Sequence, residues 1–158
     1  MAITGRQRMG TEANAHFQSK FVTFDTDKEV GLFFALDKTD SNKGVLANKT
    51  LADQPAVGFI ERGSAEGFGE AYADEPNRPL RAGEGQKVYL EGILDLGEIT
   101  FTDEEVAKRI PIYEGTAGGW TKVKTTTKGE RVRVLGFPRD KASIYVNFLI
   151  DPIGTVVV

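Results

Sequence analysis

The chain has 158 residues, of which 40% are hydrophobic and 27% are charged, a composition typical of one globular domain. It contains no cysteine, which excludes disulfides and thiolate zinc sites, and no apolar run is long enough to predict a membrane span. The formal net charge is −3, with +2 in residues 1–20 and −5 in the remainder. An acidic body argues against nucleic-acid binding, which needs clustered positive charge.

Residues 1–19 are predicted to form a flexible N-terminal arm, because residues 1–18 show no sustained hydrophobic periodicity. The arm is a candidate tether to an acidic partner surface, although a solvated terminus is the simpler interpretation. Its candidate contact residues are Arg6, Arg8, His16 and Phe17. His16 is the only histidine and lacks a recognisable orienting partner, so an exposed side chain is favoured over a catalytic base.

Residues 20–158 are predicted to form a β-domain. Its first strand is Phe21–Asp25, and the continuous apolar run Val30–Leu36 is typical of a strand buried on both sides. Further strands are predicted at Ala56–Glu61, Glu70–Ala73, Gln86–Glu91 and Ile99–Phe101. Glycine and proline mark a loop-rich insertion at about residues 63–85.

One short helical turn interrupts the strands. Thr102 and Glu105 have the spacing of a capping box, with Thr102 as N-cap and Glu105 at the third helical position. Pro111 disfavours helix at Ile110, so the turn should end near Lys108.

The last third of the chain contains four short β-patterned runs joined by brief loops. Alternation predicts that Val132 and Val134 are buried while Arg131 and Arg133 face water. It also places one set of apolar residues on a common face of the last strand: Ile144, Val146, Phe148 and Ile150. The predicted fold is all-β, a small antiparallel β-barrel or β-tulip-like sandwich with an extended N-terminal arm and at most one or two short helical turns.

The uncharged tail Ile153–Val158 has strong β propensity and would be prone to aggregate if left unpaired. It is therefore predicted to pair with a strand, in this chain or across a subunit boundary. Its candidate residues for self-association or strand addition are Ile153, Val156, Val157 and Val158.

The sequence does not predict catalysis. The acidic residues at positions 25–29 and 37–40 lack the spacing of a calcium loop, and the glycine pairs lack the pattern of a dinucleotide site. We expect no catalytic residues, no bound metal and no cofactor.

The segments Ile110–Gly115, Gly118–Thr121, Thr125–Gly129, Arg131–Gly136 and Ile144–Phe148 resemble the β-module of tailed-bacteriophage capsid decoration (head-stabilising, or cement) and head-fibre proteins. About 45 residues carry this resemblance, with looser similarity at Ala56–Glu61 and Gly85–Leu90. The long insertion and the apolar tail depart from the family pattern.

The resemblance implies a virion protein on the outer surface of the capsid, made in the host cytoplasm. Its partners would be the major capsid protein and two further copies of itself in a homotrimer, with no nucleic acid or membrane. The main alternative is a fibre module that binds a receptor or carbohydrate through Trp120, Tyr72 and Tyr113. A small β-barrel enzyme, such as an accessory domain of a hydrolase, and an assembly chaperone are further alternatives.

Overall fold

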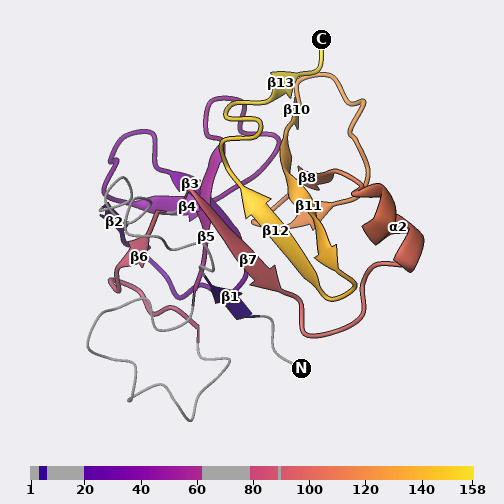
Figure 1. The fold of residues 1–158 in the computed structure, drawn as a ribbon. Helices are drawn as coiled ribbons and strands as arrows, with labels where there is room; N and C mark the ends of the chain where they lie inside the picture. Colours follow the sequence, from indigo (N-terminus) through magenta and orange to yellow (C-terminus); the bar gives the residue numbers. More distant parts are fainter. Residues whose placement is uncertain (1–3, 7–19, 62–78, 89) are drawn as a thin grey trace.

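The computed structural model describes residues 4–6, 20–61, 79–88 and 90–158. Short antiparallel strands dominate this part of the chain (Figure 1), and its largest sheet has six strands in the order β1-β7-β12-β11-β8-β9. In chain order these are β1 (Thr4–Arg6), β7 (Glu91–Asp95), β8 (Ile112–Glu114), β9 (Trp120–Thr121), β11 (Val134–Asp140) and β12 (Ser143–Asn147).

Three smaller antiparallel sheets complete the described fold. They are β4-β3-β5, β2-β6 and β10-β13. Their strands are β2 (Phe21–Val22), β3 (Phe33–Leu36), β4 (Gly44–Leu46), β5 (Ala56–Phe59), β6 (Gln86–Lys87), β10 (Arg131–Val132) and β13 (Thr155–Val156). The predicted all-β class is confirmed in sandwich-like form, and none of the described sheets closes into a barrel.

Strand β3 separates two hydrophobic clusters, as predicted for a strand buried on both sides. The Phe33 ring makes edge contacts with Phe59 and Phe148 in the larger cluster. The next residue, Phe34, packs edge-on against Phe24 in the second cluster, with ring centroids 5.5 Å apart. Neighbouring side chains of a strand point to opposite faces. One apolar run therefore contributes side chains to both clusters.

The predicted capping box is confirmed at α2 (Asp103–Lys108), the only helix in the described residues. The Glu105 backbone N–H donates to the Thr102 hydroxyl at 3.1 Å, and the Thr102 N–H donates to the Glu105 carboxylate at 3.0 Å. Donation from the Thr102 backbone is the main reason that the pKa of Glu105 is lowered. The helix stops at Arg109, two residues before Pro111.

Two glycines are needed where the chain turns or closely approaches a neighbour around the six-stranded sheet. Gly118 has φ +80° in the loop between β8 and β9, as expected for a tight turn. At Gly136, an added Cβ would lie 1.8 Å from the carbonyl oxygen of Tyr145 on β12. No larger residue fits there without moving β11 from its partner strand.

The N-terminal segment differs from the prediction where it is described. Thr4–Arg6 does not belong to a free arm but forms β1, which pairs with Ile93–Asp95 of β7 and covers what would otherwise be a sheet edge. Arg8, His16 and Phe17 lie outside the described residues. So do residues 62–78, which include most of the predicted insertion and its strand at residues 70–73.

Two strand predictions around β7 were also wrong. The predicted strand Gln86–Glu91 divides into β6 and the start of β7, which join different sheets. Residues 99–101 form no strand, and Ile99 is 77% exposed. Alternation of apolar and polar residues did not predict β7, because this strand is buried on both sides over Gly92–Leu94 and its residues do not alternate.

The predicted orientation of Arg131 and Arg133 is wrong. Both arginines are 1% exposed, whereas Val132 and Val134 are only half-buried. The arginines point inward because Glu114 of β8, itself 1% exposed, lies between them. One Glu114 oxygen is 2.6 Å from Arg131 Nη2, and the other is 3.6 Å from Arg133 Nη1.

Backbone carbonyl oxygens complete the hydrogen bonding of this network. Arg131 donates to the carbonyls of Asn48, Leu51 and Gln54. Arg133 donates to the carbonyls of Ala56, Phe148 and Asp151. Burial lowers the pKa of Arg133, and the nearby Glu114 carboxylate opposes that shift. Two guanidinium groups thus share a single carboxylate in the protein interior.

Replacing Glu114 with glutamine should lower the free energy of unfolding by about 3–5 kcal/mol, because it removes the carboxylate that both buried guanidinium groups contact. Urea unfolding followed by circular dichroism measures the change. The matched control is Glu104→Gln, which removes an exposed carboxylate 2.6 Å from Lys108 and should cost less than about 1 kcal/mol. Equal effects of the two substitutions would contradict the role given to Glu114.

Candidate interaction surface

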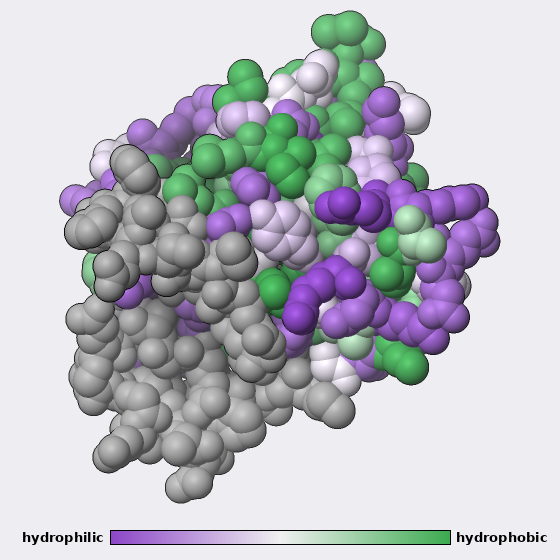
Figure 2. All heavy atoms as spheres, in the orientation of Figure 1, coloured by the Kyte–Doolittle hydropathy of each residue, from purple (hydrophilic) through white to green (hydrophobic). Residues whose placement is uncertain are grey.

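Large exposed apolar side chains gather in the last ten residues of the chain. We define the C-terminal apolar surface as the set Leu149, Ile150, Ile153, Val156 and Val158. Their exposed fractions are 59%, 43%, 73%, 39% and 104%. In Figure 2, apolar (green) atoms lie at the top of the molecule, where the chain ends, and over parts of the upper face below it. Contiguous apolar patches of a few hundred Å² commonly mark interaction sites.

The segment that carries this surface is bound to the core through Asp151. One Asp151 carboxylate oxygen accepts from the Val134 N–H at 3.1 Å, and the other accepts from the Gly154 N–H at 3.1 Å. The Asp151 carbonyl accepts from Arg133 Nε at 2.7 Å. Gly154 has φ +69°, and an added Cβ there would meet the Val132 carbonyl oxygen at 2.6 Å. This loop therefore has one defined backbone path.

Strand β13 pairs on one side with β10, in the register Arg131↔Val156 and Val132↔Thr155. The Val157 N–H donates to the Glu130 carbonyl, and the Val157 carbonyl accepts from the Gly129 N–H, each at 2.9 Å. No other described strand pairs with β13. Its outer edge is therefore open for strand addition.

The structure brings together three of the four tail residues predicted for association: Ile153, Val156 and Val158. Val157 differs, because it is half-buried and its backbone is bonded to the loop before β10. The prediction that the tail pairs with a strand is confirmed by β13. Leu149 and Ile150 were missed. Ile150 was predicted to share a face with Ile144, Val146 and Phe148, but it is exposed whereas those three are buried. The strand ends at Asn147, whose side chain accepts from the Leu149 N–H at 2.9 Å.

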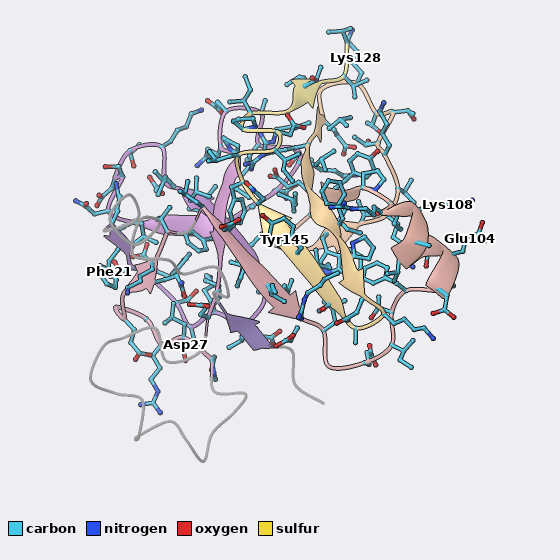
Figure 3. All side chains as sticks on the ribbon, in the orientation of Figure 1. Phe21, Asp27, Glu104, Lys108, Lys128 and Tyr145 are labelled. Carbon is cyan, nitrogen blue, oxygen red and sulfur yellow. The ribbon has the colours of Figure 1, made fainter. Side chains whose placement is uncertain are left out.

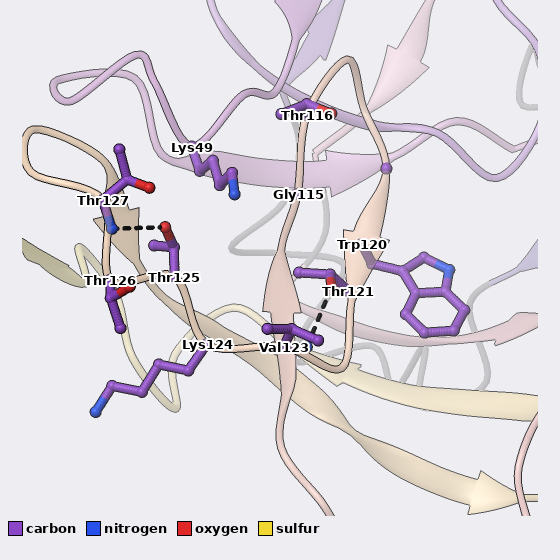
Figure 4. Close-up of a pocket in the computed structure, with 11 residues that line it drawn as sticks. Lys49, Gly115, Thr116, Trp120, Thr121, Val123, Lys124, Thr125, Thr126 and Thr127 are labelled. Carbon is purple, nitrogen blue, oxygen red and sulfur yellow. Dashed lines mark hydrogen bonds between the residues drawn. The ribbon is translucent and has the colours of Figure 1, made fainter.

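A second candidate site is an open, threonine-rich pocket of about 510 Å³ beside β9 (Figure 4). Threonine hydroxyls, Lys49 and Lys124 line it. Lys49 lies 3.2 Å from the Glu130 carboxylate, and the Thr125 hydroxyl donates to the same group. These hydrogen bonds, that of Thr125 foremost, lower the pKa of Glu130. The lining is polar, and the Lys49 charge is matched by Glu130.

Trp120 borders this pocket but does not form an aromatic platform in it. The indole points away from Lys49 and the threonines (Figure 4) and packs against Phe101, with ring centroids 5.6 Å apart. Trp120 is half-buried at the edge of the larger hydrophobic cluster, as expected for a packing role. Tyr113, from the same predicted platform, lies on β8, and Tyr72 is outside the described residues.

Among the described residues, no three histidine or acidic side chains gather closely enough to hold a metal ion. In the same part of the chain, no helix has both the length and the apolar character needed to cross a membrane. Comparison of the chain with protein-family models, with curated proteins and with solved structures gives no match.

Introducing lysine at Ile153 and Val156 together should reduce concentration-dependent self-association, because it places charge on the apolar surface beside the open edge. Sedimentation velocity over a range of concentrations measures this. The free energy of unfolding should change by less than about 1 kcal/mol, since both side chains are exposed. Val123→Lys is the control, because Val123 is 71% exposed outside this surface. If the control reduces association equally, the surface has no special role.

Proposed function

We propose that this chain is a structural virion protein that decorates and stabilises the capsid of a tailed bacteriophage. It would bind the outer surface of the expanded head across capsomer junctions, with the major capsid protein as partner and the homotrimer as its assembled form. The observation that carries the proposal is the C-terminal apolar surface with the open edge of β13. The resemblance of the strands between Ile110 and Phe148 to decoration proteins supplies the kind of partner.

The physical requirements of decoration fit such a surface. A capsid presents the same junction many times, so modest binding free energy at each contact sums over multivalent assemblies. Apolar side chains contribute affinity without a specific charge pattern, and an open strand edge adds directional backbone hydrogen bonds. Because Asp151 and Arg133 already fix the segment, binding would cost little further ordering of the chain.

A second candidate is a fibre module that binds a receptor or carbohydrate, and the threonine-rich pocket is the observation that favours it. Hydroxyl and ammonium groups there can exchange hydrogen bonds with a polar ligand. The packing of Trp120 on Phe101 covers one face of its ring, and the indole is not directed toward Lys49 and the threonines. The decoration proposal is therefore preferred.

Trp120 is the only tryptophan, so its fluorescence reports on this region alone. Titration with neutral monosaccharides should leave its emission unchanged, because the indole faces Phe101 rather than the pocket. Saturable, sugar-dependent quenching would reverse the preference and favour the carbohydrate-binding module.

The decoration proposal is tested by adding the purified protein to emptied, expanded phage heads. Bound protein should co-sediment with the heads, reach a saturating number of copies, and raise the temperature at which they break open. The Ile153→Lys, Val156→Lys double variant should bind at least about tenfold more weakly, since two apolar contacts at the centre of an interface commonly contribute that much. Val123→Lys should bind like the native protein. Native protein that binds no heads would contradict the proposal.

A further inference from the structure

A second surface hollow, of about 420 Å³, lies between α2 and the six-stranded sheet. We call it the α2 groove; the lining residues that matter here are Val106, Arg109, Phe137, Pro138, Arg139 and Tyr145. In Figure 1, α2 lies to the right of the sheet and β13 at the top, so the groove and the C-terminal apolar surface occupy different parts of the body. An apolar and aromatic floor is thus accompanied by two exposed guanidinium groups.

The backbone at Arg109 is in an unfavourable conformation for its side chain. Arg109 is the C-cap of α2, with φ 51° and ψ 55° in the left-handed region. Glycine is the residue best suited to this conformation, and other L-residues there cost of order 1 kcal/mol. An arginine at this position points to a role for its side chain beyond ending the helix.

The Arg109 side chain lies over the groove floor. Its guanidinium carbon is 5.1 Å from the centroid of the Phe137 ring, a cation–π arrangement that keeps the group beside an apolar surface. Across the groove, the Tyr145 hydroxyl donates to Glu91 at 2.5 Å and accepts from the Asn147 amide at 3.1 Å. Burial, together with the hydrogen bond to Glu91, raises the pKa of Tyr145. With its hydroxyl engaged, Tyr145 offers mainly its ring to a ligand.

The nearby acidic residues of α2 are paired with other cations. Glu104 lies 2.6 Å from Lys108 on the outer side of the helix (Figure 3), Glu105 3.0 Å from Lys122, and Asp103 3.1 Å from Lys141. Among the described residues, no carboxylate is within 4.0 Å of Arg109. Arg139 has only a 3.8 Å contact with the adjacent Asp140.

We propose that the α2 groove binds an acidic segment of a partner protein. A carboxylate of that segment would accept hydrogen bonds from Arg109 and Arg139, while a neighbouring apolar side chain would pack on the half-buried rings of Phe137 and Tyr145. Charge complementarity selects this occupant, because the groove combines two guanidinium groups with an apolar floor. This inference goes beyond the proposed function and does not depend on it.

A nucleic acid fits the same groove less well. Binding of a phosphate backbone requires a run of cations, whereas only two arginines line this hollow. A small inorganic anion would use the guanidinium groups but leave the apolar floor uncovered. An acidic peptide uses both features.

The test uses the full chain and two synthetic peptides, N-acetyl-Glu-Glu-Leu-Glu-Glu and its counterpart with glutamine in place of every glutamate. Heteronuclear NMR titration measures the dissociation constants and follows the Nε–H signals of Arg109 and Arg139. The glutamate peptide should bind in the millimolar range or tighter and shift these signals, and the glutamine peptide should not.

Arg109→Gly separates binding from folding. It should weaken binding of the glutamate peptide about tenfold, since one charge-assisted contact is lost. The thermal unfolding midpoint should stay the same or rise, because glycine relieves the left-handed backbone. Arg139→Gln should weaken binding similarly without touching that backbone. Lys108→Gln is the control, since Lys108 projects from the outer side of α2 (Figure 3), and it should bind like the native chain.

Three results would overturn the inference. The first is that neither peptide binds the native chain, or both bind equally. The second is that Lys108→Gln weakens binding as much as Arg109→Gly, which would indicate general charge attraction. The third is that inorganic phosphate at equal concentration displaces the peptide completely, which would make the groove a simple anion site. None of these results depends on phage heads, so failure here is distinguishable from failure of the proposed function.

Discussion

The buried pairing of Glu114 with Arg131 and Arg133 constrains more of this fold than any other interaction. One carboxylate neutralises only one of the two cations, so the remaining positive charge must be solvated by the protein itself. Carbonyl oxygens from residues 48–56 and 148–151 provide that solvation. The loops that contain these residues are thereby held in positions from which their carbonyl groups point toward the two arginines. The desolvation of three charged groups costs free energy, but it also specifies where these loops lie.

This constraint extends directly to the C-terminal apolar surface. Arg133 donates to Phe148 and Asp151, which lie at the start and in the middle of the segment carrying the exposed residues. Asp151 then fixes the turn to β13 through Val134 and Gly154. A buried charge network is therefore coupled to an exposed apolar edge through a few hydrogen bonds. Because the surface is already ordered, a partner that binds it would not lose free energy to ordering this segment.

The sequence predicted those elements whose signal is local. The capping box of Thr102 and Glu105 needs only nearby residues, and the structure confirms it. Alternation correctly placed Ile144 and Val146 on one face of their strand, and the structure buries both. It failed at Arg131 and Arg133 because it reveals two faces of a strand but not which face is inside. The signal that could have corrected it is Glu114, a single acid in an apolar strand, whose partner lies 17 residues away. The Glu114 N–H donates to the Arg133 carbonyl, so β8 lies beside the segment from β10 to β11 and these charges meet.

The two candidate surfaces also differ in whether nearby residues in the sequence reveal them. The uncharged tail was recognised because six residues in sequence carry it, whereas the α2 groove unites a helix C-cap with a distant hairpin and has no sequence signature. The two surfaces also differ in what they can contribute to an interface. Burial of the apolar residues is non-directional and mainly strengthens binding, while guanidinium groups of fixed position favour one orientation and reject mismatched partners. In the proposed decoration role, placement in one orientation on a repetitive surface would use both kinds of contact, held at fixed separation. The six-stranded sheet supplies that separation, because β11 joins the Arg133 network at its start to Phe137 and Arg139 of the groove at its end.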